Sequence, residues 1–163
     1  MIIPSPPIQL VLTGPDDPEL REQLAKLAHP EHLSETRFYP AGMPEWLIFR
    51  IEQEGRLAGE IRLQAIRWFN RKAEISIFIV EDCRGKGLGK AALEALIRHA
   101  FTAMNLHRLE AEVYEYNLAG NALFKHFGFI EEGRLREARY FDGKYWDIIR
   151  YGLLRGEYKF ECN

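Results

Sequence analysis

One strand and the loop after it constrain the fold of this chain more than any other feature. Residues 73–80, AEISIFIV, are rich in β-branched side chains and become apolar on both faces toward the end of the run. A strand of this kind is typical of a sheet interior that is covered on both sides. It leads into a loop with three glycines and then into the helical run KAALEALIRHAFTAMN at 90–105. The sequence therefore predicts a central strand, a tight turn and a long helix that packs back on the sheet.

The other expected elements are short, and strands and helices are interspersed. They are a strand at 8–12, a helix that starts near Pro18 and is closed by Pro30, a hairpin at 45–66 that turns at Gly55, a strand at 107–116, a helix at 118–128, and a hairpin at 129–154 that turns at Asp142-Gly143. This order predicts an α+β fold with a central mixed β-sheet flanked by helices. Because no repeat, low-complexity stretch or linker interrupts it, we expect a single domain over residues 1–163.

Composition excludes several classes of partner. The net charge is −2 and acidic and basic residues are mixed along the chain, which argues against nucleic-acid or membrane-surface binding. No apolar run approaches the ~18 residues of a membrane span, and there is no signal-peptide pattern. Cys83 and Cys162 have no metal-ligand spacing, and neither has any cluster of His, Cys and Asp. We therefore expect a reduced, cytoplasmic protein without a metal.

The loop before the predicted helix has the composition of an anion site. Three glycines lie among Arg84, Lys86 and Lys90, directly ahead of the helix. A helix N-terminus carries free N–H groups and a partial positive charge, and glycines let a phosphate approach these amides without meeting a Cβ. The pattern predicts a phosphate or pyrophosphate site, and the alternative is a plain turn with solvated basic residues.

Two familiar phosphate motifs fail by register. A Walker A loop needs Ser or Thr after Gly-Lys, but Gly89-Lys90 is followed by Ala91, and the earlier glycine position holds Arg84. The dinucleotide fingerprint Gly-x-Gly-x-x-Gly needs a glycine three residues after Gly87, where this chain has Lys90. The loop therefore belongs to neither class.

The pattern that does fit is Arg-x-x-Gly-x-Gly at 84–89, which resembles the pyrophosphate loop of the GNAT superfamily of acetyl-CoA-dependent N-acetyltransferases. The stretch EVYEYNLAGNALFKHFGF at 112–129 is similar to the downstream signature of that family, an acidic strand, an asparagine, a short helix and Gly-Phe. The stretch EGRLREARYFDGKYWDIIRYGLL at 132–154 resembles the closing hairpin of its ribosomal-protein and spermidine acetyltransferase branch. Three motifs in family order imply the GNAT acyl-CoA N-acyltransferase fold, with the region before residue 45 the least similar.

The resemblance implies acetyl-CoA as co-substrate and also implies the residues that hold it. The strand before the loop would diverge from the next strand, and its backbone would pair with the pantetheine arm. The implied contacts are Ile77, Phe78 and Ile79 with pantetheine, Arg84, Gly85, Lys86, Gly87, Leu88, Gly89 and Lys90 with pyrophosphate, and Asn117, Asn121 and Phe124 nearby. Taken alone, Ile77–Ile79 could simply be core, and Asn117 could be a helix cap.

Acetyl transfer to an amine also needs a base. The resemblance implies Glu112, five residues before Asn117, and Glu74 is the second candidate because partial burial on the central strand would raise its pKa. Strand alternation places Arg108, Glu110, Glu112 and Tyr114 on one face, so these glutamates could instead be exposed carboxylates paired with Arg108. A base that acts through a water chain is equally open.

Both proton donors that the family uses for the departing thiolate are absent. The tyrosine position four residues before Gly-Phe holds Phe124, and the serine position three residues after the asparagine holds Gly120. Tyr114, Tyr116 or Ser76 could substitute, or water could, because a free thiol has a pKa of about 8.5.

We therefore predict an N-acetyltransferase that moves an acetyl group from acetyl-CoA to a primary amine, either a protein N-terminus or a small molecule, by direct attack in a ternary complex. The alternative is a GNAT-fold module that binds acyl-CoA as a sensor without turnover, which the missing tyrosine and serine would suit. The oligomeric state is left open by the sequence, although the long C-terminal hairpin could pair with another copy to form a homodimer.

Overall fold

A computed structural model describes residues 2–5, 8–11, 17–18, 22–23, 26 and 42–159 of the chain. The chain divides into two compact units, Met1–Arg37 and Phe38–Asn163. In the first unit, β1 (Ile2–Ser5) pairs antiparallel with β2 (Ile8–Val11). The strand expected at 8–12 is confirmed, whereas β1 was not predicted, because it contains Pro4 and is followed by two further prolines. The helix expected after Pro18 lies largely outside the described residues.

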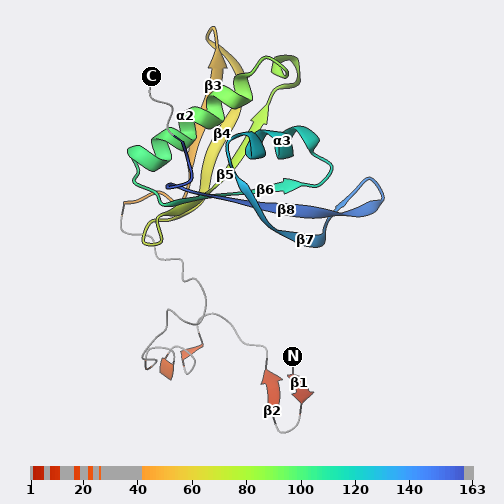
Figure 1. Ribbon diagram of the computed structural model, residues 1–163. Helices are drawn as coiled ribbons and strands as arrows, with labels where there is room; N and C mark the ends of the chain where they lie inside the picture. Colours follow the sequence, from red (N-terminus) through yellow and green to blue (C-terminus); the bar gives the residue numbers. More distant parts are fainter. Residues whose placement is uncertain are drawn as a thin grey trace. The chain divides into compact units, whose positions relative to one another are not determined.

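The second unit is built on a six-stranded sheet with the order β3-β4-β5-β6-β8-β7 (Figure 1). Only β5 and β6 run parallel, so the sheet is mixed, as predicted. Helix α2 follows β5 and helix α3 follows β6. The bounds are β3 (Leu47–Gln53), β4 (Arg56–Arg67), β5 (Lys72–Ile79), α2 (Leu88–Thr102), β6 (Arg108–Tyr114), α3 (Leu118–His126), β7 (Ile130–Phe141) and β8 (Lys144–Leu154).

One hydrophobic core joins both helices to the same face of the sheet, called the inner face below. Helix α2 buries one stripe of side chains, and α3 adds Asn121 and Phe124. The α2 stripe is Leu93, Leu96, Ile97, Ala100 and Phe101. On β6 the buried residues Leu109, Ala111 and Val113 alternate with polar ones, so the polar set faces the opposite, outer face. The predicted shared face of Arg108, Glu110, Glu112 and Tyr114 is therefore present, and it is the outer one.

Two tight hairpins form at the predicted turns. Glu54-Gly55 joins β3 to β4, and Asp142-Gly143 joins β7 to β8. Both residues of each pair have positive φ, between 52° and 76°. Two-residue turns of this kind match the twist of antiparallel strands, which explains why Asp-Gly was a reliable signal in the sequence.

Strands β5 and β6 pair only where they begin. Their parallel register joins Lys72 to Arg108, Ala73 to Leu109 and Glu74 to Glu110. Beyond Glu74 they diverge, while β5 stays paired with β4 up to Ile79 and β6 stays paired with β8 (Figure 1). A bulge in β4 next to Gln64 lies at the same level. The sheet therefore contains a gap that opens toward the end of β5, where the glycine loop begins.

Candidate active site

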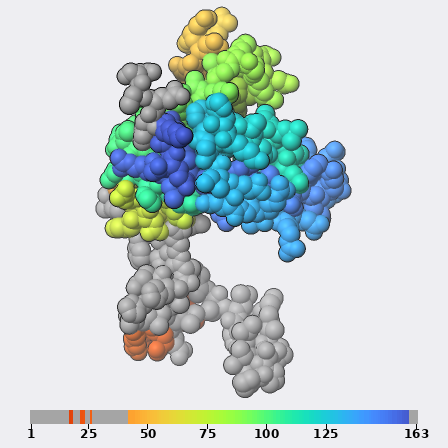
Figure 2. All heavy atoms as spheres, in the orientation of Figure 1, coloured from red at the N-terminus to blue at the C-terminus, as the bar shows by residue number. Residues whose placement is uncertain are grey.

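The glycine loop turns sharply between the end of β5 and the start of α2. Gly85 has φ of +74° and Gly87 has φ of +81°, a left-handed conformation that side chains with a Cβ rarely adopt. A Cβ built on either glycine would meet no atom within 4 Å. Both glycines are therefore required by backbone conformation and not by crowding, and the space around them is open. Figure 2 shows the atoms of this loop at the surface of the molecule.

The N-terminus of α2 is not capped by any described side chain. Its N-cap residue is Gly87, and the first turn contains no acidic residue. The first backbone bond of the helix runs from the Ala91 N–H to the Gly87 carbonyl, at 3.1 Å. The three preceding N–H groups thus have no partner within the helix, which leaves them able to bind an anion.

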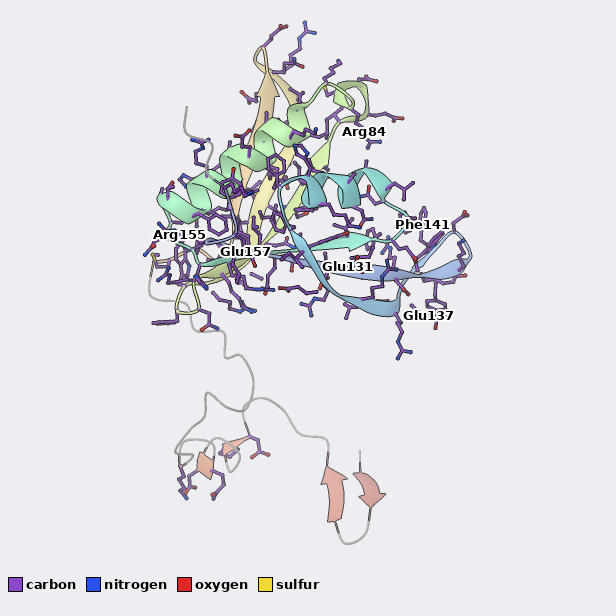
Figure 3. All side chains as sticks on the ribbon, viewed as in Figure 1. Arg84, Glu131, Glu137, Phe141, Arg155 and Glu157 are labelled. Atoms are coloured by element: carbon purple, nitrogen blue, oxygen red, sulfur yellow. The ribbon has the colours of Figure 1, made fainter. Side chains whose placement is uncertain are left out.

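The remaining loop residues fit a phosphate ligand to different degrees. Lys86 and Lys90 are exposed, whereas Arg84 donates from Nε to the Ile79 carbonyl at 3.0 Å and so ties the loop to the end of β5 (Figure 3). A Cβ on Gly89 would lie 3.6 Å from Ile79 and 3.9 Å from Leu123, which is ordinary contact. Neither conformation nor crowding requires glycine at position 89.

The predicted pantetheine strand borders the gap. The Val80 N–H donates to the Ala58 carbonyl on β4 at 2.9 Å. Because backbone direction alternates along a strand, the backbone groups of Ile77 and Ile79 face away from β4, into the gap. Ile77 also packs against the core, while the side chain of Phe78 is 53% exposed. The interpretation of all three residues as core is therefore wrong for Phe78.

Helix α3 starts on the other side of the gap, and its N-terminus is capped. The Asn117 Oδ1 accepts from the Gly120 N–H at 2.9 Å, the capping arrangement that the sequence left open. A Cβ on Gly120 would lie 2.7 Å from Asn117 Nδ2 and 3.1 Å from Val113. A serine at position 120 would displace this cap, which gives a physical reason for glycine there.

Asn121 lies on the buried side of α3, is 8% exposed, and has both polar atoms of its side chain hydrogen-bonded within the protein. Its Nδ2 donates to the carbonyls of Tyr114 (3.1 Å) and Asn117 (2.8 Å), and its Oδ1 accepts from the Tyr151 hydroxyl at 2.8 Å. This network fixes α3 against the end of β6 and against β8. The predicted contact of Asn121 with the cofactor stays a prediction, and both Nδ2 protons are already donated.

Phe124 is 4% exposed and lies in the core under α3. Its ring meets Phe129 edge-on at 5.0 Å and stacks with Tyr151 at 6.2 Å between centroids. The residue therefore has a packing role in the chain itself. Its predicted place beside a thioester stays a prediction.

A cavity of about 350 Å³ lies at the point where β5 and β6 part. It brings together Glu74 and Glu112, the two residues predicted as candidate bases. The charged groups that line it are four carboxylates and three cations, Glu74, Glu110, Glu112, Glu132, Lys72, Arg108 and Arg150. They come from β5, β6, β7 and β8, so only the folded sheet assembles them.

Arg108 is the most heavily bound cation of this cavity. Its Nε donates to Glu110 at 2.7 Å, and both terminal nitrogens donate to the two carboxylate oxygens of Glu132. Glu132 reaches Arg108 by lying across β8 at Gly152, where a Cβ would overlap its carboxylate. The hydrogen bond with Glu132 raises the pKa of Arg108 and lowers that of Glu132.

The two candidate bases have different surroundings. Glu112 faces the Arg150 Nε at 3.2 Å and forms an ion pair with it. Glu74 accepts from the neutral Gln64 Nε2 at 2.6 Å. Burial raises the pKa of Glu74; the Gln64 hydrogen bond opposes this shift, and the nearby charges of Glu112 and Glu110 add to it. The surroundings therefore favour Glu74 over Glu112 as a proton acceptor.

Sequence patterns did not identify Gln64, Glu132 and Arg150 as part of the site. Each reaches the cavity across a strand boundary, and the register that brings it there is not written in any short motif. The alternation around Arg150, in DIIRYGLL, was the one sequence feature that could have indicated any of these three residues.

Two negative findings apply to the part of the chain that the structure describes. It contains no group of three or more His, Cys, Asp or Glu side chains arranged to hold a metal ion. None of its helices is both long enough and apolar enough to cross a membrane.

The sequence profile of the acetyltransferase (GNAT) domain family matches residues 18–149. The chain belongs to the GNAT acetyltransferase family. Solved structures agree with the GNAT fold: the spermidine N-acetyltransferase of Vibrio cholerae, determined in complex with CoA and spermine, matches 86% of this chain and 76% of its own, with a TM-score of 0.66 and 28% identity. The predicted fold class and family are therefore confirmed.

Curated relatives of this GNAT chain belong to the same branch. YdaF of Bacillus subtilis, provisionally named a ribosomal N-acetyltransferase, is 36% identical over 108 residues, 66% of this chain and 59% of the relative. The spermidine N(1)-acetyltransferase of Vibrio cholerae is 31% identical over 107 residues, 66% of this chain and 62% of the relative. The chain thus spans about three fifths of the length of these relatives.

Proposed function

We propose that the chain is an acetyl-CoA-dependent N-acetyltransferase that moves an acetyl group to a primary amine by direct attack in a ternary complex. The observation that carries the proposal is the gap between β5 and β6. One end of the gap meets the N-terminus of α2, which no described side chain caps and which suits an anion. The other end meets a cavity in which Glu74 forms no ion pair with any residue that the structure describes. Membership of the GNAT family and the names of its relatives support the same class of reaction.

In this proposal the loop and the gap bind the co-substrate. The open space at Gly85 and Gly87 and the free amides at the start of α2 would hold the pyrophosphate, with Lys86 and Lys90 adding charge. The backbone groups of Ile77 and the N–H of Ile79 would pair with the pantetheine arm, as a missing strand would, while the Ile79 carbonyl accepts from Arg84. The thioester would then lie near the start of the gap, next to Glu74.

Glu74 would remove a proton from the acceptor ammonium, directly or through a water molecule. The freed nitrogen attacks the thioester carbonyl, the C–N bond forms, and the C–S bond breaks as the thiolate leaves. Ser76 and Tyr114 lie on the outer face and are exposed, so either of them, or water, could return a proton to the thiolate. Holding both substrates in one gap supplies a further part of the rate.

The test is a turnover screen that follows release of the CoA thiol with N-terminal peptides, polyamines, amino sugars and amino acids. With the best acceptor, Glu74→Gln should lower turnover by about 10²–10⁴-fold, while CoA affinity stays level. Glu112→Gln is the matched control and should cost much less. Raising the pH should rescue part of the Glu74→Gln loss, because more acceptor then arrives deprotonated.

Three results would change this assignment. If Glu112→Gln abolishes turnover and Glu74→Gln does not, the two roles are reversed. If neither matters, proton removal runs through water or the substrate. If the protein binds CoA but releases no thiol with any amine, the sensor alternative holds, and a large rate created by Phe124→Tyr would point the same way.

Three coarser expectations accompany the proposal. We propose one domain over residues 1–163, because the family match begins inside the first compact unit. We propose a cytoplasmic location on the ground of cysteine usage. A homodimer through the β7–β8 hairpin is proposed because three exposed aromatic residues lie next to its turn, and sedimentation tests it. These residues are Tyr140, Phe141 and Tyr145, of which Phe141 is labelled in Figure 3.

A further inference from the structure

The carboxylates of the cavity are almost all neutralised by cations of the protein. Glu110 faces Arg108 at 2.7 Å and Lys72 at 3.6 Å, and Glu132 holds both terminal nitrogens of Arg108. Glu112 faces Arg150. Among the described residues, Glu74 is the one lining carboxylate without an ion pair, since its hydrogen-bond partner is the neutral Gln64. The charges of the cavity would therefore be balanced by one ammonium group bound at Glu74.

Arg108 and Arg150 differ in how many of their guanidinium nitrogens already bind a carboxylate of the protein. Arg108 uses all three of its guanidinium nitrogens on Glu110 and Glu132. Arg150 meets Glu112 as an ion pair through Nε at 3.2 Å and makes no hydrogen bond to a described residue. Its side chain is 53% exposed. The two terminal nitrogens of Arg150 thus form a fork that is open to a ligand, and such a fork fits a carboxylate in bidentate fashion.

We propose that the acceptor is a small amine that also carries a carboxylate, with its ammonium on Glu74 and its carboxylate on the terminal nitrogens of Arg150. This inference rests on the proposed acetyltransferase function and names the substrate class. A cavity of about 350 Å³ is large enough for such a molecule. Glu74 and Arg150 line the same cavity, so one small molecule can reach both groups.

The length of the acceptor follows from the sheet. Glu74 and Arg150 lie on β5 and β8, with β6 between them. Neighbouring strands are about 4.8 Å apart, so the two backbones are separated by roughly 10 Å, and the side chains shorten the span from both ends. An amino acid with several carbons between its amine and carboxylate fits this span better than glycine does.

A polyamine fits the described cavity poorly. Only its first ammonium would find an unpaired carboxylate. Every further ammonium would come close to Arg150, Lys72 or Arg108, at a like-charge cost. The charge pattern therefore separates this chain from a polyamine enzyme even though the fold does not.

The experiment compares 4-aminobutyrate with 4-aminobutyramide, which has the same length and no negative charge, and includes glycine, β-alanine and spermidine. Thiol release gives kcat/KM for each acceptor with the full chain and acetyl-CoA. The kcat/KM of the acid should exceed that of its amide by a factor on the order of 10 to 100, because a hydrogen-bonded pair of opposite charges contributes an effect of that size. Arg150→Gln should bring this ratio close to one. Arg98→Gln, which removes an exposed cation from α2, should leave the ratio unchanged.

A ratio near one in the natural protein, or a preference for spermidine that Arg150→Gln does not alter, overturns the inference and leaves the acetyltransferase proposal standing. If no amine releases thiol, the acetyltransferase proposal fails, and calorimetry with CoA present decides the inference by itself. Binding of 4-aminobutyrate that Arg150→Gln removes supports it, and absence of binding overturns it. Should Arg150→Gln not fold, Arg150→Lys, which keeps the charge and loses the fork, should still lower the ratio.

Discussion

Two helices begin on either side of the gap between β5 and β6, and they begin in opposite ways. Helix α2 starts at Gly87, which has a positive φ and open surroundings, and no described side chain caps its first amides. Helix α3 starts at Asn117, whose side chain caps the first turn and presses against Gly120. One N-terminus is available to a ligand, and the other is closed by the protein itself.

The comparison shows that glycine serves two different physical purposes near the starts of the two helices. In the α2 loop it permits a backbone conformation, and an added Cβ would meet nothing. In α3 it permits a close approach, and an added Cβ would collide with the cap. Substitutions at these positions should therefore affect different properties, ligand affinity in α2 and stability in α3.

The largest effect is expected from Gly87→Asp. A carboxylate at this position would face a bound pyrophosphate, and two unit charges at 4 Å repel by roughly 4 kcal/mol at a surface-like dielectric. CoA affinity should fall by about three orders of magnitude, as measured by calorimetry. Gly87→Asn is the matched control, because it has the same shape at the same positive φ without the charge. Unchanged affinity in folded Gly87→Asp would remove the loop from the binding site.

Gly120→Ala should act on stability in the opposite region. The new Cβ would lie 2.7 Å from Asn117 Nδ2, so the cap or the helix must shift. Such overpacking typically costs about 1–3 kcal/mol, which a denaturant titration would measure. CoA affinity of the folded fraction should change far less. A variant as stable as the natural protein would mean that the cap moves aside freely, and the contrast with α2 would weaken.

Asn117→Ala removes the cap of α3 and should cost about 1 kcal/mol of unfolding free energy. Asn117→Ser keeps a side-chain acceptor and should restore most of the loss. The same pair tests the implied cofactor contact of Asn117. If CoA affinity falls in both variants while stability returns in the serine variant, Asn117 contacts the cofactor in addition to capping the helix.

Gly89→Ala should have the smallest effect on folding. Its Cβ would make ordinary contacts with Ile79 and Leu123, and alanine favours a helix over glycine by up to about 1 kcal/mol. Thermal unfolding should therefore show equal or higher stability, whereas CoA affinity should drop if pyrophosphate approaches the Gly89 amide. Equal affinity in this variant would place the phosphate elsewhere on the loop.

Local patterns predicted the parts of the fold that depend on local causes. Both hairpin turns, the central strand and the helix that Gly128 ends were found where the sequence placed them. Helix α2 covers 88–102 instead of the predicted 90–105, because it includes Leu88-Gly89 and stops before Asn105, which has φ of +53°. These differences affect helix ends, where local signals are weakest.

The site depends on pairings between distant strands, and these could not be predicted from the sequence. Alternation along β6 placed Glu110 and Glu112 on one face and allowed both to pair with Arg108, but it could not show that Arg108 binds Glu110 whereas Arg150 faces Glu112. The consequence is large, since these pairs leave Glu74 as the cavity carboxylate that forms no ion pair within the described part of the chain. The sequence identified the candidate bases, and only the cross-strand register distinguishes their surroundings.

Gly152 also affects the register in which β8 pairs with its neighbouring strands. Glu132 crosses β8 at this glycine to reach Arg108, so β7 is linked to β6 over the strand between them. If β8 slipped by two residues, the inner and outer faces would stay matched, but Arg150 or Leu154 would take the place of Gly152 and block the crossing. The absence of a side chain at Gly152 thus helps to specify the register of β8. It disfavours pairings shifted by two residues, which the alternation of hydrophobic and polar residues alone would allow.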